Sequence, residues 1–249
     1  MPASSPVCIV VGIGPGLGVA LARRFVQGGC HVAAVGRRAT KVAELVAALR
    51  DEGGDVTGFS GDAGDPASLS KVFDRIRAES GQPEILIYNA ALIEPARFVT
   101  SSAAAEVRYA PNVGWRARGV PADFDYVVDA FKTNVAGALH ASQEALRTMR
   151  QLGRGTILLT GGILAFDPWL EWGVTALGKA ALRSLGLSLA KELTEEGIHV
   201  VTIAIHGTMQ AGTPYDPNLV ADAYWRLYQQ PRQEWQPEFH FKAGDRSSQ

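Results

Sequence analysis

Cysteine is scarce in this sequence: only Cys8 and Cys30 occur among 249 residues, and both lie in apolar, strand-like contexts. Two such cysteines argue against a disulfide framework and against a thiolate metal site, so we expect two buried, inert thiols. No apolar run approaches the roughly 18 residues that indicate a membrane-spanning helix, and no secretory signal precedes the first apolar run. We therefore expect a soluble, cytoplasmic protein with no membrane partner.

An excess of charge of either sign is also missing. The formal net charge is −1, and no long basic run occurs. This balance argues against a nucleic-acid surface and against binding to an anionic membrane, so the expected partner is a small molecule. With 47% hydrophobic residues, 20% charged residues and no internal repeat, the chain is typical of one domain covering residues 1–249.

The most informative stretch is Val7–Gly18, an apolar run that breaks into glycines and continues as a helix. Such a run predicts a strand buried on both faces, and the glycines permit a tight turn. After the turn, apolar residues recur at helical spacing, so a helix N-terminus, which attracts anions, faces it. We therefore predict a pyrophosphate-binding turn, with a purely structural turn as the alternative. Its residues are Gly12, Gly14, Gly16, Leu17 and Gly18.

The second apolar run, residues 30–36, is followed by Arg37 and Arg38. A dinucleotide-binding fold that prefers NAD carries an acid for the ribose 2′-hydroxyl about 20 residues after the glycines. Two guanidinium groups suit a 2′-phosphate instead, because they are always charged and donate bidentate hydrogen bonds. The sequence therefore favours NADP(H), the alternative being two solvated arginines that open the next helix.

Short apolar strands alternate with amphipathic helices along the chain. After the first strand and helix, the expected strands are 30–36, 55–61, 84–91, 155–162 and 198–205, and the expected helices are 41–52, 68–79, 125–150, 174–196 and 217–228. This alternation predicts an α/β fold with a doubly wound parallel sheet, the Rossmann fold, whose ligand lies at the carboxyl ends of the strands. Asp62, Ala63 and Asn89 follow or end such strands, so we expect them at the cofactor.

Two regions fall outside this alternation. Residues 92–124 lack a sustained periodicity and contain several prolines and glycines, so they are interpreted as a long loop, either a substrate-facing lid, another binding loop or a disordered segment. Residues 231–249 are interpreted as a polar C-terminal tail without a secondary-structure element.

By these features the sequence resembles the short-chain dehydrogenase/reductase family over nearly its whole length. The residues that carry the resemblance are the spaced glycines Gly12, Gly16 and Gly18, the turn Asn89-Ala90-Ala91, the segment Asn134-Val-Ala-Gly137, and Lys179. The resemblance implies that the asparagine turn supports the adenine side of the cofactor and that Lys179 holds the nicotinamide ribose. It also places Asn134 in the catalytic set and Gly207 at the cofactor. The two long helices, 125–150 and 174–196, resemble the family's pairing surface, which predicts a homodimer or homotetramer.

Two catalytic positions of the family are changed. Its tyrosine, one helical turn before the lysine, is Thr175 here, and its serine falls on Gly162. Reduction of a ketone needs a proton for the developing alkoxide, which a lysine-assisted phenol with a reference pKa of about 10 supplies and a threonine hydroxyl does not. Hence another residue supplies the proton, the reaction needs none, or redox chemistry is lost. Tyr215 is the first candidate for another acid.

Residues 165–172 lie where the family places its substrate loop. The pair Asp167-Pro168 with nearby tryptophans is similar, in part, to a motif of atypical members without the tyrosine, notably fungal alkaloid reductases that also steer a Diels–Alder cyclisation. In those enzymes an arginine accompanies the aspartate, and Lys132 takes its position. A carboxylate stabilises an iminium, which accepts hydride without an added proton, and aromatic faces add cation–π attraction. The alternatives are a turn residue before Pro168, and tryptophans that pack in the core or at a dimer interface.

The sequence thus predicts an NADPH-dependent oxidoreductase that reduces an imine, an iminium or a related electrophile of a small organic substrate. The expected catalytic residues are Asp167, Lys179, Asn134, Lys132 and Thr175, and the expected substrate contacts are Trp169, Trp172 and Tyr215. Two other functions stay open: a non-redox cyclase or isomerase that uses Asp167, and a catalytically inactive NADP(H)-binding protein. No metal site is expected.

Overall fold

The computed structural model describes residues 5–101 and 118–244, which form a single α/β domain built on a seven-stranded sheet. All neighbouring strands pair in parallel, in the order β3-β2-β1-β4-β5-β6-β7. The strands are β1 Val7–Val11, β2 His31–Gly36, β3 Val56–Ser60, β4 Pro83–Tyr88, β5 Gly155–Thr160, β6 Ile198–Ile205 and β7 Glu238–Phe241. The order reverses direction next to β1, which places the switch point between β1 and β4 and confirms the doubly wound sheet.

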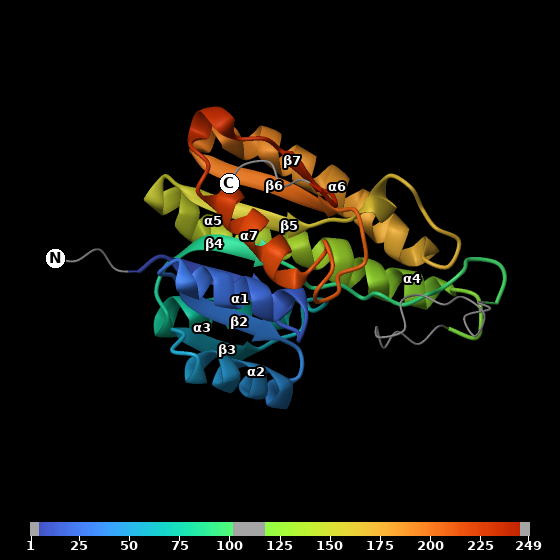
Figure 1. Ribbon diagram of the computed structural model, residues 1–249, viewed down its shortest axis with the longest axis horizontal. Coiled ribbons are helices and arrows are strands. Elements are labelled where there is room, and N and C mark those ends of the chain that lie inside the picture. Colours follow the sequence, from blue (N-terminus) through green and yellow to red (C-terminus); the bar gives the residue numbers. More distant parts are fainter. Residues whose placement is uncertain (1–4, 102–117, 245–249) are drawn as a thin grey trace.

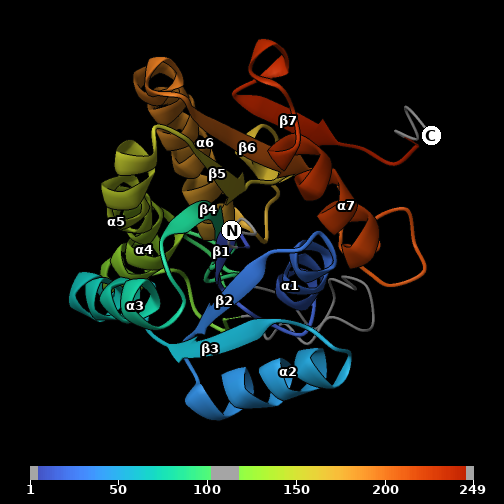
Figure 2. The same ribbon diagram turned by 90° about the vertical axis from the view of Figure 1, so that its left-hand side faces the viewer.

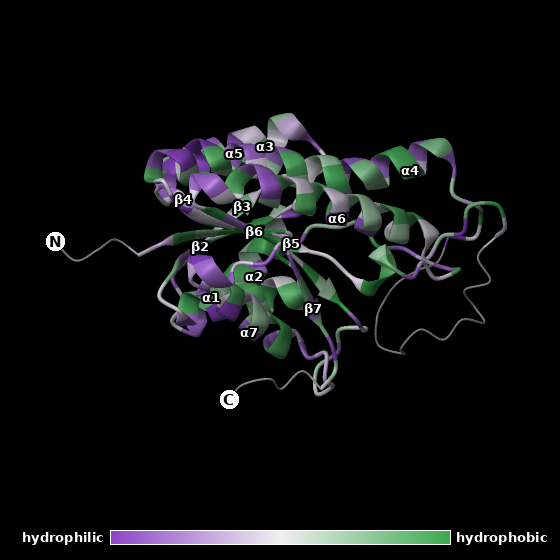
Figure 3. Ribbon diagram, turned by 90° about the horizontal axis from the view of Figure 1, so that it is seen from above, coloured by the Kyte–Doolittle hydropathy of each residue, from purple (hydrophilic) through white to green (hydrophobic). Residues whose placement is uncertain are grey.

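Helices cover both faces of the sheet (Figures 2 and 3). On one face lie α1 Leu17–Gln27, α2 Ala39–Asp51 and α7 Pro217–Tyr228; on the other lie α3 Pro66–Glu79, α5 Gly137–Leu152 and α6 Gly173–Leu193. The short helix α4 Phe124–Phe131 projects beyond the sheet, at the end opposite to the N-terminus (Figure 1). The strands run toward this end, so their carboxyl ends face α4.

The core forms two apolar clusters, one on each face of the sheet. Phe25 of α1 and Tyr224 of α7 are fully buried in the first, and Phe73 of α3 and Tyr88 of β4 lie in the second. Strands β1 and β6 are buried along their whole length, as their unbroken apolar sequences predict.

The long helix expected over residues 125–150 is interrupted. Between α4 and α5 the chain makes one wide π-helical turn, Lys132–Ala136. This turn brings the amide of Asn134 to the backbone of Leu92, with which it exchanges hydrogen bonds of 2.6 and 3.2 Å. A π-turn in a helix is often found at a functional site, and here it ties the helix to the loop after β4.

The prediction that residues 231–249 hold no element is wrong within the described residues, because Glu238–Phe241 adds strand β7 to the edge of the sheet. The strand has only four residues, and the prolines at positions 231 and 237 before it are typical of a loop. Its alternation of polar Glu238 and His240 with Phe239 and Phe241 is the signal that predicts a half-buried strand.

Within residues 5–101 and 118–244, no helix is both long enough and apolar enough to cross a lipid bilayer.

Candidate active site

The turn after β1 is tightly packed against the protein on one side only. Gly12 has a φ of +99°, and a Cβ there would lie 2.4 Å from the backbone nitrogen of Ala90, so the position requires glycine. A Cβ at Gly18 would lie 2.6 Å from the carbonyl oxygen of Gly12. By contrast, a Cβ at Gly14 or Gly16 would meet no described atom within 4 Å. The turn therefore presents open backbone, at the start of α1, to anything that lies beside it.

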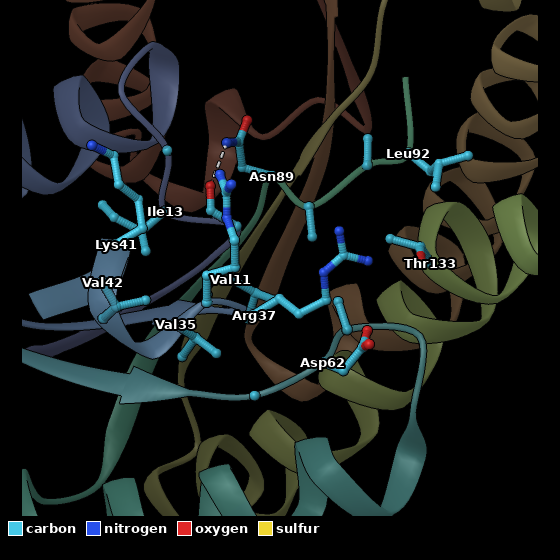
Figure 4. A pocket seen from close by; sticks show the side chains of 18 of the residues that line it. Val11, Ile13, Val35, Arg37, Lys41, Val42, Asp62, Asn89, Leu92 and Thr133 are labelled. Carbon is cyan, nitrogen blue, oxygen red and sulfur yellow. Dashed lines mark hydrogen bonds between the residues drawn. The ribbon is translucent and has the colours of Figure 1, made fainter. Parts of the chain in front are cut away.

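A cavity of about 310 Å³ lies beside this turn (Figure 4). It is formed where the chain leaves β1, β2, β3 and β4. Its lining includes the predicted cofactor residues Gly12, Gly14, Arg37, Arg38, Asp62, Ala63, Asn89, Ala90 and Ala91. The predicted residues Gly16, Leu17 and Gly18 are not among the lining residues; Leu17 and Gly18 are buried beneath the turn.

Cationic side chains line this cavity where the chain passes from β2 to α2. Arg37 and Arg38 are exposed, and Figure 4 shows Arg37 reaching across the cavity toward Asp62 and Thr133. The Asp62 carboxylate accepts a 2.8 Å hydrogen bond from the backbone of Gly64. Lys41, in the first turn of α2, is a third cation that the sequence analysis missed. Its position in the first turn of the helix that follows the two arginines is the signal that could have found it.

The turn after β4 joins this cavity to a second one. The Asn89 amide donates a 2.9 Å hydrogen bond to the carbonyl oxygen of Gly12, which holds the turns after β1 and β4 together. Both Asn89 and Ala91 line the first cavity and also the second. A ligand that extends from the arginines past Asn89 therefore enters the second cavity.

The second cavity has a volume of about 150 Å³ and a mostly apolar wall. Thr175 and Lys179 reach it from adjacent turns of α6, which confirms that they share one face of a helix. The Lys179 ammonium is buried and donates a 2.6 Å hydrogen bond to the carbonyl oxygen of Thr160. Burial lowers the pKa of Lys179 to about 8. The lining also contains Ile163, Leu164, Trp169, Trp172, Ile205, Gly207, Thr208 and Met209.

Asn134 lies behind this cavity rather than in its wall. It is buried, its amide holds the backbone of Leu92, and a Cβ at Gly178 would lie 2.9 Å from its Nδ2 atom. It therefore fixes the loop after β4 against the turn of α6 that carries Lys179. The geometry gives Asn134 a positioning role.

The two predicted tryptophans line the second cavity, and a clamp between two loops holds one of them. Trp172 is buried, and the parallel bridge between Trp172 and Ala96 joins the loop after β5 to the loop after β4. The backbone of Ala96 donates a 2.7 Å hydrogen bond to the carbonyl oxygen of Glu171. The Glu171 carboxylate, only 2% exposed, forms an ion pair with Arg97. We call Ala96, Arg97, Glu171 and Trp172 the loop clamp.

The structure does not bring the predicted pair Asp167 and Lys132 to the cavity that contains Lys179. Asp167 is exposed, because the short turn Ile163–Ala165 directs it outward and its backbone nitrogen bonds to the carbonyl oxygen of Ile163. Lys132 forms an exposed ion pair with Asp129 at 2.9 Å, so it does not accompany Asp167. Neither side chain lines the cavity.

Tyr215, the predicted alternative acid, has a structural role instead. Its hydroxyl accepts a 3.0 Å hydrogen bond from the backbone of Ala243, and its ring packs at 6.1 Å, centroid to centroid, from Phe241. A Cβ at Gly207 would lie 2.3 Å from this ring, so Tyr215 sits behind the backbone that lines the cavity. The reason is β7, which the sequence analysis missed: Phe241 is its last residue, and Ala243 follows it two residues later.

A polar network beside the cavity also depends on β7. His206 and His240 share a hydrogen bond of 2.8 Å between Nε2 and Nδ1, and Nε2 of His240 is 3.0 Å from the Glu238 carboxylate. Glu238 in turn pairs with Arg183 of α6. The ring of Phe166 lies 5.0 Å from that of His240 and 4.6 Å from the Arg183 guanidinium carbon. These contacts anchor Phe166, so the residue after it, Asp167, faces solvent.

The proposed lid, residues 92–124, is described only in part. Residues 102–117 lie outside the described part of the chain, whereas residues 92–101 carry the loop clamp and residues 118–123 lead into α4. Among the described residues, no group of three or more histidine, cysteine, aspartate or glutamate side chains is arranged to hold a metal ion.

Comparison with known proteins points to one family. Residues 6–213 match the short chain dehydrogenase family. The chain is 30% identical over 195 residues to oxidoreductase asL5 of Sarocladium schorii, which covers 77% of this chain and 68% of that protein. It is 28% identical over 189 residues to 2,3-dihydro-2,3-dihydroxybenzoate dehydrogenase of Bacillus subtilis, which covers 74% and 64%. These matches span about two thirds of the relatives' own length.

Solved structures share the fold over almost the whole chain. A short-chain dehydrogenase of Rhodopseudomonas palustris is 25% identical, with a TM-score of 0.76 and coverage of 97% of this chain and 99% of that one. A metagenomic short-chain oxidoreductase in complex with NADP is 18% identical, with a TM-score of 0.78 and coverage of 96% and 98%. The family match includes the spaced glycines, the asparagine turn and the helical lysine. The chain therefore belongs to the short-chain dehydrogenase family.

Proposed function

We propose that this protein is an NADPH-dependent reductase that delivers a hydride to a neutral imine, or to a related electrophile, of a small organic substrate. The observation that carries the proposal is the pair of joined cavities. One is polar and lined by Arg37, Arg38 and Lys41, the other is apolar and contains Lys179, and Asn89 and Ala91 belong to both. An extended dinucleotide would place its phosphates in the first cavity and its reactive ring in the second.

The shape of the glycine turn fits the cofactor. Its backbone faces open space at Gly14 and Gly16, where the pyrophosphate would lie against the N-terminus of α1. The cations of the β2–α2 connection would hold a 2′-phosphate, and Asp62 would face the adenine side. When bound, NADPH would supply the hydride. Lys179 would hold the nicotinamide ribose, as the family resemblance implies.

The substrate class follows from the charges in the second cavity. Lys179 is the only ionisable side chain among the described residues that line it, and no carboxylate lies there to stabilise a permanent iminium cation. A positive charge placed near the ammonium would be repelled, so a neutral C=N or C=O group is favoured over an iminium. The faces of Trp169 and Trp172 suit a planar, apolar substrate.

The non-redox cyclase that the sequence leaves open relies on Asp167 inside the substrate cavity, and the exposed position of that residue gives it no support. A catalytically inactive NADP(H)-binding protein would need only the first cavity. Lys179 lines the second cavity, and its buried ammonium has no carboxylate partner among the described residues. Because burying such a charge destabilises a protein, its presence favours turnover.

Single-turnover oxidation of NADPH tests this function. The protein with bound NADPH is mixed with α-tetralone or dihydroisoquinoline, a bicyclic ketone and a bicyclic imine of similar size, and the absorbance of the reduced nicotinamide is followed. We expect oxidation with at least one of the two. A cyclase predicts product without NADPH, and an inactive protein predicts no reaction with either compound.

We also propose that the protein assembles as a homodimer or homotetramer through α5 and α6. Leu139 on α5 and Leu177 on α6 are 37% and 43% exposed in the single chain, which supports a partner for this surface.

A further inference from the structure

Among the described residues that line the second cavity, Lys179 is the only group that could replace the family's tyrosine. Besides the lysine, its polar side chains are Asn89, Thr160, Thr175 and Thr208, none of which gives up a proton near neutral pH. Tyr224, whose hydroxyl donates to Thr160 Oγ1 at 2.9 Å, is fully buried, and burial raises its pKa far above the ordinary value. The Tyr215 hydroxyl accepts a hydrogen bond from the backbone of Ala243, just after β7.

The substitutions at the two family positions also clear the approach to the lysine. Thr175 is much shorter than a tyrosine, and a Cβ at Gly162 would touch only the Ile205 carbonyl oxygen, at 3.8 Å. The resulting cavity of about 150 Å³ extends to Lys179. No described phenol therefore stands between this apolar cavity and Lys179.

We propose that Lys179 is the general acid of this enzyme and donates its proton directly to the reduced substrate. The proposal rests on the proposed reductase function and extends it. As hydride from the reduced nicotinamide adds to the substrate carbon, the π-electron pair moves to the oxygen or nitrogen. One N–H bond of the Lys179 ammonium breaks, and its proton forms the new O–H or N–H bond. The neutral amine then takes a proton from solvent.

The surroundings of Lys179 suit this role. An ammonium has three N–H donors, and within the described part of the chain Lys179 uses one of them, on the Thr160 carbonyl oxygen. Two remain, one for the cofactor ribose and one for the substrate. With a pKa of about 8, caused by burial alone, the side chain is protonated at neutral pH and still releases its proton readily.

The other charged groups near this part of α6 are engaged elsewhere. Arg183, one turn beyond Lys179, pairs with Glu238 of β7, which also accepts a hydrogen bond from His240. Asp167, on the loop after β5, is exposed. Neither side chain lines the cavity, so neither competes as the acid or sets the charge of Lys179.

The first test measures the titration of Lys179 without any turnover. The lysine ε-methylene groups are labelled with carbon-13 and followed by NMR as the pH is raised, and the spectrum of Lys179→Met identifies the Lys179 signal. We expect a midpoint near pH 8 for Lys179, whereas the exposed Lys132 titrates above its ordinary value because of Asp129. A midpoint of Lys179 at or above that of Lys132 would overturn the proposal.

The second test uses Lys179→Arg, which keeps a cation but has no proton to give near neutral pH. At saturating NADPH, we expect kcat/KM for α-tetralone to fall at least about 100-fold, within the range typical of a lost general acid. In the wild type, kcat/KM should decrease above pH 8. The double variant Lys179→Arg with Thr175→Tyr should recover activity, because a phenol again stands in the cavity.

The two proposals fail in different ways. If the wild type oxidises no NADPH with either test compound, the proposed function fails, and the NMR titration still reports on Lys179. If the wild type turns over but Lys179→Arg is equally active, or if its pH profile is flat through pH 8, the reductase stands and Lys179 is not the acid.

Discussion

Removing Arg97 should destabilise the loop clamp far more than removing an exposed ion pair does. Glu171 is 2% exposed, so Arg97→Met removes a cation that pairs with a buried carboxylate. Breaking a buried pair in this way costs about 3–5 kcal/mol, whereas an exposed pair contributes roughly 0–1 kcal/mol. Arg75→Met is the matched control, because Arg75 and Glu79 form an exposed pair, with side chains 54% and 45% exposed.

Hydrogen exchange at the Ala96 amide measures the clamp locally, since this amide donates to the Glu171 carbonyl oxygen at 2.7 Å. In Arg97→Met we expect exchange to accelerate by at least about 100-fold, which corresponds to a loss of about 2.7 kcal/mol. The emission of the buried Trp172 should shift to the red. Adding Glu171→Gln should restore part of the protection, because a neutral amide replaces the buried charge. If Arg97→Met and Arg75→Met exchange alike at Ala96, the clamp does not hold the loop as we infer.

Three further predictions concern stability, the loop and assembly. His199 is buried and stacked 4.8 Å from Trp235, and burial lowers its pKa to about 4. As the pH falls, His199 is therefore protonated in the unfolded chain before it is protonated in the folded one. The free energy of unfolding should decrease by up to roughly 3 kcal/mol between about pH 6.5 and pH 4. In urea titrations, His199→Gln should weaken this pH dependence. Asp167→Asn should change kcat/KM by less than about threefold because the carboxylate is exposed; loss of product formation would instead support the cyclase. Light scattering at micromolar concentration should report a dimer or tetramer. Leu177→Glu on α6 should weaken this assembly, whereas a monomeric wild type would contradict the proposed interface.

The sequence predicts the fold well because its signals are local and repeated. The runs around Val7–Val11 and Ile198–Ile205 are apolar throughout, and both are strands that are buried on both faces. The helix 217–228 begins with a proline at its first turn and is bounded as expected. The sequence did not predict strand β7, because the strand has only four residues and follows two prolines. Its alternation of polar and apolar residues is too short to indicate a strand.

Site residues were predictable only where a helix or a strand fixes their position. Thr175 and Lys179 share a helical face, and Asn89 directly follows a strand, so their cavities follow from the fold. The direction of a loop side chain does not follow in this way. Asp167 faces solvent because Phe166 packs on His240 and Arg183, and those contacts exist only once β7 and α6 are adjacent. Tyr215 is held by β7 for the same reason.

The claim on which the account depends is that the first cavity holds NADPH through the cations after β2. Titration of the purified protein with NADPH and NADH measures it most directly. We expect NADPH to bind at least about tenfold tighter, because a charge-assisted hydrogen bond to the 2′-phosphate contributes about 1.5–3 kcal/mol, and we expect Arg37→Ala to remove most of this preference. Equal affinities for the two cofactors in the wild type, or no binding of either, would contradict the account.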